Sequence, residues 1–260
     1  VESGATGRAR LVWAAVLLAV GASLAVTTLF MANGPLLSST AGPGGVAVAV
    51  GLALLAPRLV TVYGALFPAR LGATVRLAVR NLRARARHTA AVVAPLVLLV
   101  GIAAGTLSMQ RAEDSVPHGA DDAGAKLASV NYLVVAMITA FAAIVVVTTL
   151  VAATRRRTRE FGLLRLAAIT DRQTLKLVTV EASLTTGLAV LLGGVAATAT
   201  TVPYSLVRTG SPLAAGSVWM FLAVVGGALL LSLGAAVPTA ARALRTRPID
   251  AVAGGSRGAA

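Results

Sequence analysis

The stretch VNYLVVAMITAFAAIVVVTTLVAA, residues 130–153, decides the fold of this protein. It contains no charged residue, and TRRRTR, residues 154–159, follows it directly. A helix of about 20 mostly apolar residues crosses the roughly 30 Å of hydrocarbon in a bilayer. Because arginine collects at the cytoplasmic ends of such helices, this stretch predicts a transmembrane helix that ends in the cytoplasm.

Similar apolar runs lie on both sides of this stretch. Four are clear, and a fifth, 45–66, is weaker because it contains Pro57 and Arg58. Arginine near a helix end can extend its guanidinium to the headgroups, so we keep this span. The sequence therefore predicts an all-α polytopic membrane protein of about six transmembrane helices, at residues 11–32, 45–66, 89–109, 130–153, 177–207 and 214–238.

The composition agrees with lipid as the solvent. Apolar residues make up 57% of the chain and charged residues 12%, whereas soluble domains average nearer a quarter charged. The net charge of +14 could suggest nucleic acid as a partner, but only 4% of the residues are the aromatics that stack on bases. The arginines lie in short runs between apolar stretches, so we predict no nucleic-acid partner.

The distribution of charge orients the spans. With the N-terminus inside, the basic residues of 8–10, 70–87, 155–172 and 242–247 all lie in the cytoplasm. The opposite side then holds the uncharged loop 33–44, the acidic loop 110–129 and a turn at 208–213. All loops agree with the positive-inside rule, and both termini are predicted to be cytoplasmic. The alternative is that the first span is a cleaved signal peptide, which would leave five spans.

The spans divide into two groups. Residues 1–75 form a transmembrane hairpin over a turn rich in Gly and Pro. Residues 76–253 begin with the arginine-rich RLAVRNLRARARHTA and contain the other four spans, and residues 254–260 form a cytoplasmic tail. The segment 154–172 mixes arginines with Phe161 and several leucines on more than one helix face. It is either a juxtamembrane anchor on anionic lipid or an interfacial helix that docks a cytosolic partner.

Three stretches of the sequence carry recognisable motifs. The first is an arginine-flanked motif followed by a Gln and by a Glu at the start of the next membrane helix; its residues are Arg157, Arg159, Glu160, Phe161, Gly162, Leu163, Leu164, Arg165, Leu166, Ala167, Thr170, Gln173 and Glu181. The second is the ending VPTAARALRTRPIDAVAG, and the third is RLAVRNLRARARHTAAVVAPLV before the third span. Together these stretches resemble the FtsX-like permease family of ABC transporters, which includes the MacB type.

The resemblance implies a C-terminal four-helix FtsX core, joined by a hairpin to a second core as in actinobacterial members. The chain would then be the C-terminal part of a ten-helix permease or a shortened relative. Two features depart from the family. Only residues 110–129 stand where the family usually has a large extracytoplasmic domain, and the usual Gly-Ala-Thr reads Ala168-Ile169-Thr170. Glycine suits a left-handed helix cap better than alanine does, so either the helix is expected to continue one residue further or the turn is expected to differ.

The resemblance also implies function. It indicates a permease subunit in the bacterial cytoplasmic membrane that couples ATP hydrolysis, by a cytosolic ABC ATPase dimer, to export or mechanotransmission. The partners implied are this ATPase, the lipid bilayer and a second FtsX core. The residues implied in ATPase binding are Arg157, Arg159, Glu160, Phe161, Gly162, Leu163, Leu164 and Arg165. The alternatives are a non-transporting regulator of a cell-wall hydrolase or sensor, and an unrelated secondary transporter, whose usual mid-membrane charges are missing here.

Catalytic chemistry is not indicated by the sequence. There is no Walker A motif, and the only lysines, Lys126 and Lys176, do not follow a glycine-rich loop. We predict that the chain is not an enzyme and has no cofactor or metal. Serines and threonines within the spans, such as Thr185 and Ser232, are expected to bond to helix carbonyls rather than act on substrate.

Three further residues are candidates for structural or coupling roles. Gly101 and Gly105 form a GxxxG motif, which predicts a helix-packing face. Glu181 is an acidic residue near the start of the fifth span, and such residues usually face the bundle interior with a partner. It is expected either to pair with Arg155 or Arg156, or to act as a latch between segment 154–172 and the fifth span.

Overall fold

A computed structural model describes residues 2–34, 36–67, 72–115, 122–155, 170–212 and 217–244. Within these ranges the secondary structure is entirely helical, with seven helices and no strand. Six of the helices are long and apolar enough to cross a membrane, which confirms the predicted fold class. The helices are α1 (Glu2–Phe30), α2 (Leu37–Ala65), α3 (Ala73–Ala84), α4 (Ala86–Asp114), α5 (Asp122–Arg155), α7 (Asp171–Thr209) and α8 (Ser217–Leu244).

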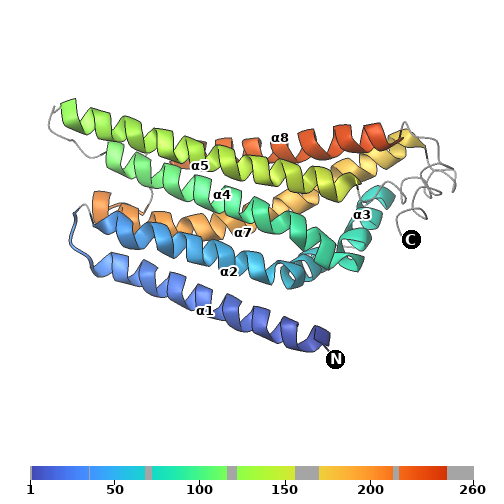
Figure 1. The fold of residues 1–260 in the computed structure, drawn as a ribbon, viewed down its shortest axis with the longest axis horizontal. Coiled ribbons are helices and arrows are strands. Elements are labelled where there is room, and N and C mark those ends of the chain that lie inside the picture. Colours follow the sequence, from blue (N-terminus) through green and yellow to red (C-terminus); the bar gives the residue numbers. More distant parts are fainter. Residues whose placement is uncertain are drawn as a thin grey trace.

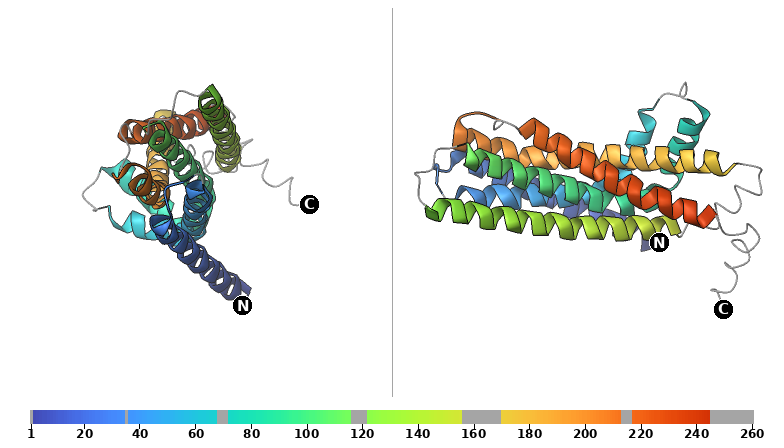
Figure 2. Two further views of the ribbon diagram at one scale, coloured as in Figure 1. Left: turned by 90° about the vertical axis from the view of Figure 1, so that its left-hand side faces the viewer. Right: turned by 90° about the horizontal axis from the view of Figure 1, so that it is seen from above.

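The long helices run side by side, and the short helix α3 lies across one end of the bundle (Figure 1). We call this end the α3 end. The start of α1 and the finish of α8 both lie at the α3 end (Figure 1), so the described chain enters and leaves the bundle on the same side. Figure 2 shows α1 at the edge of the bundle, where it packs mainly on α2.

Several helices extend beyond their predicted limits. Helix α2 begins at Leu37 and continues through Pro57. Helices α4 and α5 take up much of the predicted loop 110–129, since α4 ends at Asp114 and α5 begins at Asp122. Helix α8 continues past Pro238 to Leu244, because its last turns pack against α7 in a cluster that includes Val178, Ala236 and Ala240. Prolines are tolerated in such helices because neighbouring helices and side chains compensate the lost backbone bond.

Small residues let α2, α4 and α7 approach closely. A Cβ added at Gly45 would lie 1.5 Å from Oγ1 of Thr200, so the Thr200 side chain of α7 packs directly on the backbone of α2 there. A Cβ added at Gly193 of α7 would lie 2.7 Å from Cβ of Val100 and 3.0 Å from the amide nitrogen of Gly101. Close backbone approach maximises dispersion contacts, the main source of helix association in lipid, where the hydrophobic effect is absent.

The largest buried apolar cluster joins these helices to α5 and α8. Val60, Val93, Val97 and Val146 are fully buried within it. By contrast, large apolar side chains on α1, α5 and α8 are exposed, with Trp13, Phe141 and Trp219 as examples. Exposed apolar surface on this scale is expected where acyl chains rather than water surround the helices. The packing thus places α2, α4 and α7 at the centre of the bundle.

Candidate functional site

The residues predicted to bind an ATPase, Arg157 to Arg165, lie outside the described residues. The structure does describe both flanks of this segment. Helix α5 ends at Arg155 and α7 begins at Asp171, and both of these helix ends lie at the α3 end of the bundle (Figure 1). The segment therefore connects two helix ends on the side where α3 lies.

The start of α7 is fixed by a capping box. The Thr170 side chain accepts a hydrogen bond from the amide of Gln173, at 3.3 Å, and the Thr170 amide donates to Oε1 of Gln173, at 3.1 Å. Asp171 in the first turn adds a favourable charge at the helix N-terminus. Thr170 and Gln173 were noted only as parts of the family motif, although their Thr-x-x-Gln spacing is itself a helix-start signal.

Glu181 lies in the first half of α7, about three turns after the capping box, and is buried with 9% of its surface exposed. Its Oε1 accepts a hydrogen bond of 2.7 Å from the Asn81 side-chain amide. Asn81 lies on α3, so the bond ties the crosswise helix to α7. Asn81 was not among the predicted site residues. Its position on the polar part of an arginine-rich segment gave no signal that it would face Glu181.

Gly101 and Gly105 lie inside the chain's own bundle. A Cβ added at Gly101 would be 3.1 Å from Cβ of Ala196 and 3.4 Å from Cβ of Ala49. The same test at Gly105 meets Oγ1 of Thr200 at 3.4 Å. The GxxxG face of α4 is therefore occupied by α7 and α2 within one molecule.

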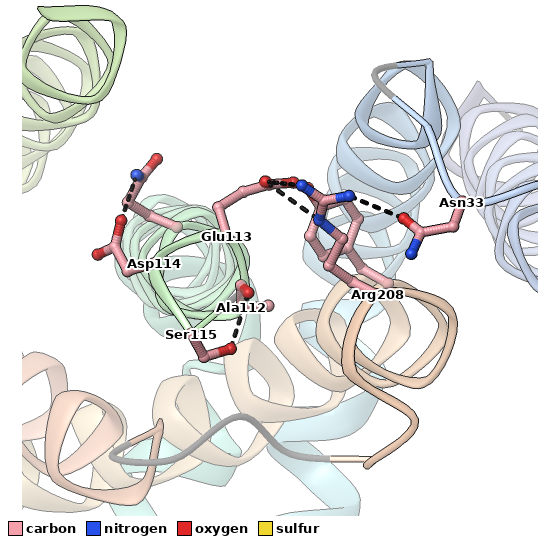
Figure 3. Close-up of polar contacts among 8 residues, drawn as sticks. Asn33, Ala112, Glu113, Asp114, Ser115 and Arg208 are labelled. Atoms are coloured by element: carbon pink, nitrogen blue, oxygen red, sulfur yellow. Dashed lines mark hydrogen bonds and ion pairs between the residues drawn. The ribbon is translucent and has the colours of Figure 1, made fainter. Parts of the chain in front are cut away.

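A polar cluster fastens the opposite end of the bundle, where α4 and α7 finish. The Arg208 guanidinium lies between the Glu113 carboxylate and Asn33 (Figure 3). It bonds to Oε2 of Glu113 at 2.7 Å and donates to Oδ1 of Asn33 at 2.8 Å. The Tyr204 hydroxyl donates to the other oxygen of Glu113. The cluster connects the α1–α2 turn, α4 and α7, and we refer to these four residues as the Arg208 cluster.

Sequence reasoning placed Glu113 and Arg208 on the same side of the membrane but did not pair them. The sequence showed only that Glu113 is an acidic residue of one predicted loop and that Arg208 is the single basic residue of another. Which residues of two separate loops meet depends on the lengths and rotations of the helices that carry them, and these were set by packing.

Replacing Arg208 with alanine is expected to lower the free energy of unfolding by about 1–3 kcal/mol, because charge-assisted bonds to Glu113 and Asn33 are lost. Arg208 and Glu113 are largely shielded, with 19% and 31% of their side chains exposed. The measurement is SDS-induced unfolding of the detergent-solubilised chain. Glu113→Gln should lower the free energy of unfolding by much less in the Arg208→Ala background than in the wild type.

The matched control is Arg111→Ala, which removes an exposed arginine from the same end of α4. Surface charges contribute within about 0.5 kcal/mol, so this variant should unfold like the wild type. Additive effects of the Glu113 and Arg208 substitutions would contradict the coupling that we assign to the cluster.

Comparison with known proteins found a family that part of this chain resembles. Residues 132–248 match the family model FtsX-like permease C-terminal. This range includes most of α5, without its first turns, and all of α7 and α8. It also includes the segment predicted to bind an ATPase. Comparison with curated proteins and with solved structures gave no match. The match supports the FtsX-like permease family, whose members are membrane permeases and not themselves ATPases. The chain is thus a multi-pass membrane protein whose residues 132–248 are similar to the C-terminal domain of FtsX-like permeases.

Proposed function

We propose that this chain is the membrane subunit of an ABC transporter, which couples ATP hydrolysis by a separate ATPase to export or mechanotransmission across the bacterial cytoplasmic membrane. The observation that carries the proposal is the similarity of residues 132–248 to the FtsX-like permease C-terminal domain. The finer assignment, to the C-terminal core of a MacB-type, actinobacterial permease that works with a second core, is part of the same proposal. It rests on the sequence motifs.

In this proposal the α3 end faces the cytoplasm. Its helix ends carry most of the described arginines, including Arg83, Arg87, Arg155 and Arg172, as the positive-inside rule requires of a cytoplasmic face. Segment 154–172 joins two helices at this end and is thus available to a cytosolic ATPase dimer. Arg157, Arg159, Glu160, Phe161, Gly162, Leu163, Leu164 and Arg165 would make that contact.

Force applied to this segment would pass directly into α7. The capping box at Thr170 fixes the first turn of that helix, and Glu181 links the helix to α3 two to three turns later. Further along, Gly193 holds α7 in backbone contact with α4, and the Arg208 cluster joins the far ends of the same two helices. Helix α7 is thus fastened to α3 near its start and to α4 at its far end, and its close packing on α4 between these points favours movement of the helices as a rigid unit.

The proposal is tested by co-purifying the chain with the ABC ATPase encoded beside it. Exchanging charges at the contact, with Glu160→Arg and Arg165→Glu together, is expected to reduce recovered ATPase by about tenfold, because several kcal/mol separate matched from opposed charge pairs at an interface. Association that persists undiminished would refute the assignment of this segment.

The control exchanges charges at the other end of the bundle, with Glu113→Arg and Arg208→Glu together. This variant keeps the net charge and the composition, as does the test variant, but its changes lie away from the α3 end. ATPase recovery should stay at the wild-type level. A loss of ATPase in both variants would indicate a general defect in folding.

A further inference from the structure

A cavity of about 1110 Å³ lies within the bundle at the α3 end. Its walls come from the junction of α3 and α4, the last turns of α5, the first half of α7, and α8. Sites for small molecules usually have volumes of about 300–1,000 Å³, so this space is large enough for an organic ligand.

One buried hydroxyl on the lining has no partner. Ser232 is fully buried and lies about three turns, or about 18 Å, before the end of α8. Its Oγ has no hydrogen-bond partner among the described residues, against the expectation that it would bond to a helix carbonyl. Thr149 and Thr185 also line the cavity and do form such bonds, to the carbonyls of Val145 and Glu181. Because an unpaired buried hydroxyl is costly, a ligand acceptor at Ser232 would be favourable.

Much of the surrounding wall is apolar. Val92 on α4, Leu150 on α5 and Ala236 on α8 contribute to it. Ala91 and Ala152 also line the cavity and are exposed side chains, so an apolar opening lies between the first turns of α4 and the last turns of α5. In a membrane-spanning bundle, such an opening gives lipid access to the interior.

The charged groups of the lining disfavour an ionised ligand at Ser232. The basic residues among the described lining are Arg83, Arg85, Arg87 and His88, and all lie at the edge of the cavity, where α3 turns into α4. A cation would have to pass this edge. The carboxylate of Glu181 lies further in, about three turns along α7, and an anion would share the interior with it. A buried charge without a counterion is costly, so the inner wall favours an uncharged group.

These features together select a molecule with an apolar body and one uncharged hydrogen-bonding group. A hydrocarbon would leave the Ser232 hydroxyl without a partner. A small polar solute would leave the apolar wall in contact with water. A glycerol ester of fatty acids supplies both parts, since its carbonyl oxygen accepts a hydrogen bond and its acyl chains cover apolar surface.

We propose that this cavity is a binding site for an uncharged glycerolipid of the diacylglycerol class. Its ester carbonyl accepts a hydrogen bond from Ser232, and its acyl chains lie along the apolar wall. The site does not depend on the proposed transport function. A lipid bound there contacts α4, α5, α7 and α8 together, and thereby stabilises the α3 end of the bundle.

The test compares dioctanoylglycerol with its dioctyl ether analogue, by native mass spectrometry of the full chain in a neutral detergent. The ether keeps the glycerol and the alkyl chains but lacks the carbonyl acceptors. The wild type should retain the ester about threefold to tenfold more strongly, the range expected for one neutral hydrogen bond. In Ser232→Ala the two lipids should be retained equally, to within about twofold. Detergent competes with both lipids alike, so their ratio reports the carbonyl.

The matched control is Thr186→Ala. Thr186 on α7 is also fully buried and its Oγ1 also has no partner among the described residues, but it does not line the cavity. This variant should keep the wild-type ratio of ester to ether. Ser232→Ala removes a hydroxyl without a partner, so its melting temperature without lipid should be at least that of the wild type. A normal melting temperature would separate a lost contact from a folding defect.

Four results would overturn the proposal. The first is no saturable retention of either lipid by the wild type. The second is equal retention of ester and ether, which would indicate that water satisfies Ser232. The third is a preference for the ester that survives in Ser232→Ala. The fourth is stronger retention of dioctanoylphosphatidic acid than of dioctanoylglycerol, which would indicate a site for anions.

Discussion

Replacing Gly193 with alanine is expected to destabilise the protein by about 1–3 kcal/mol, since an added methyl overpacks a closed helix interface. The new Cβ would lie 2.7 Å from Cβ of Val100 and 3.0 Å from the amide nitrogen of Gly101. Neither atom can rotate away, because the backbone of α4 fixes both. Relief requires α4 and α7 to separate, which would also disturb the neighbouring contact between Gly45 and Thr200.

SDS-induced unfolding and elution of the detergent-solubilised chain would measure this effect, and Gly193→Leu should prevent recovery of monodisperse protein. The matched control is Gly226→Ala on α8, where an added Cβ has no atom within 4 Å. Alanine favours a helix interior by up to about 1 kcal/mol over glycine, so the control should be neutral or slightly stabilised. Equal destabilisation of both variants would show that the α4–α7 contact is looser than described.

Removing the Glu181 carboxylate is expected to release α3 from α7. The chain contains no cysteine, so a single Ala78→Cys substitution on α3 provides one thiol at a fully buried position. In that background Glu181→Ala should raise the rate of maleimide labelling by about tenfold or more, because a part-buried Asn81 amide left without its acceptor costs about 1–3 kcal/mol. Glu181→Gln retains an acceptor oxygen and should raise the rate much less.

The control for α3 release is Glu113→Ala, which removes a carboxylate from the opposite end of the bundle. It should leave the labelling rate of Cys at position 78 unchanged, whereas its stability falls through the Arg208 cluster. An unchanged rate in Glu181→Ala would show that α3 is held by its apolar contacts alone, among them those of Val79 and Leu82.

Much of this architecture could be predicted from the chain because each span is determined locally. A run such as 130–153 has the length and apolarity to cross a bilayer whatever surrounds it. The weak span at 45–66 was also correct, since Pro57 is accommodated within α2. Helix limits were less well predicted. The turns of α4, α5 and α8 beyond the apolar runs are stabilised by neighbours such as Asp114 with Tyr132, and Leu244 with α7.

The sequence by itself determined the helical class, the six spans and the resemblance carried by segment 154–172. It also determined that the basic residues lie in alternate loops. These depend on composition and order along the chain. Only the tertiary structure decided that Asn81 meets Glu181, that Arg208 joins Glu113 to Asn33, and that the GxxxG of α4 is covered by α7 and α2. Such pairings depend on the rotation and relative depth of whole helices. A displacement of one residue along a helix turns its side chains by about 100°, so their partners are set by the packing of the entire bundle.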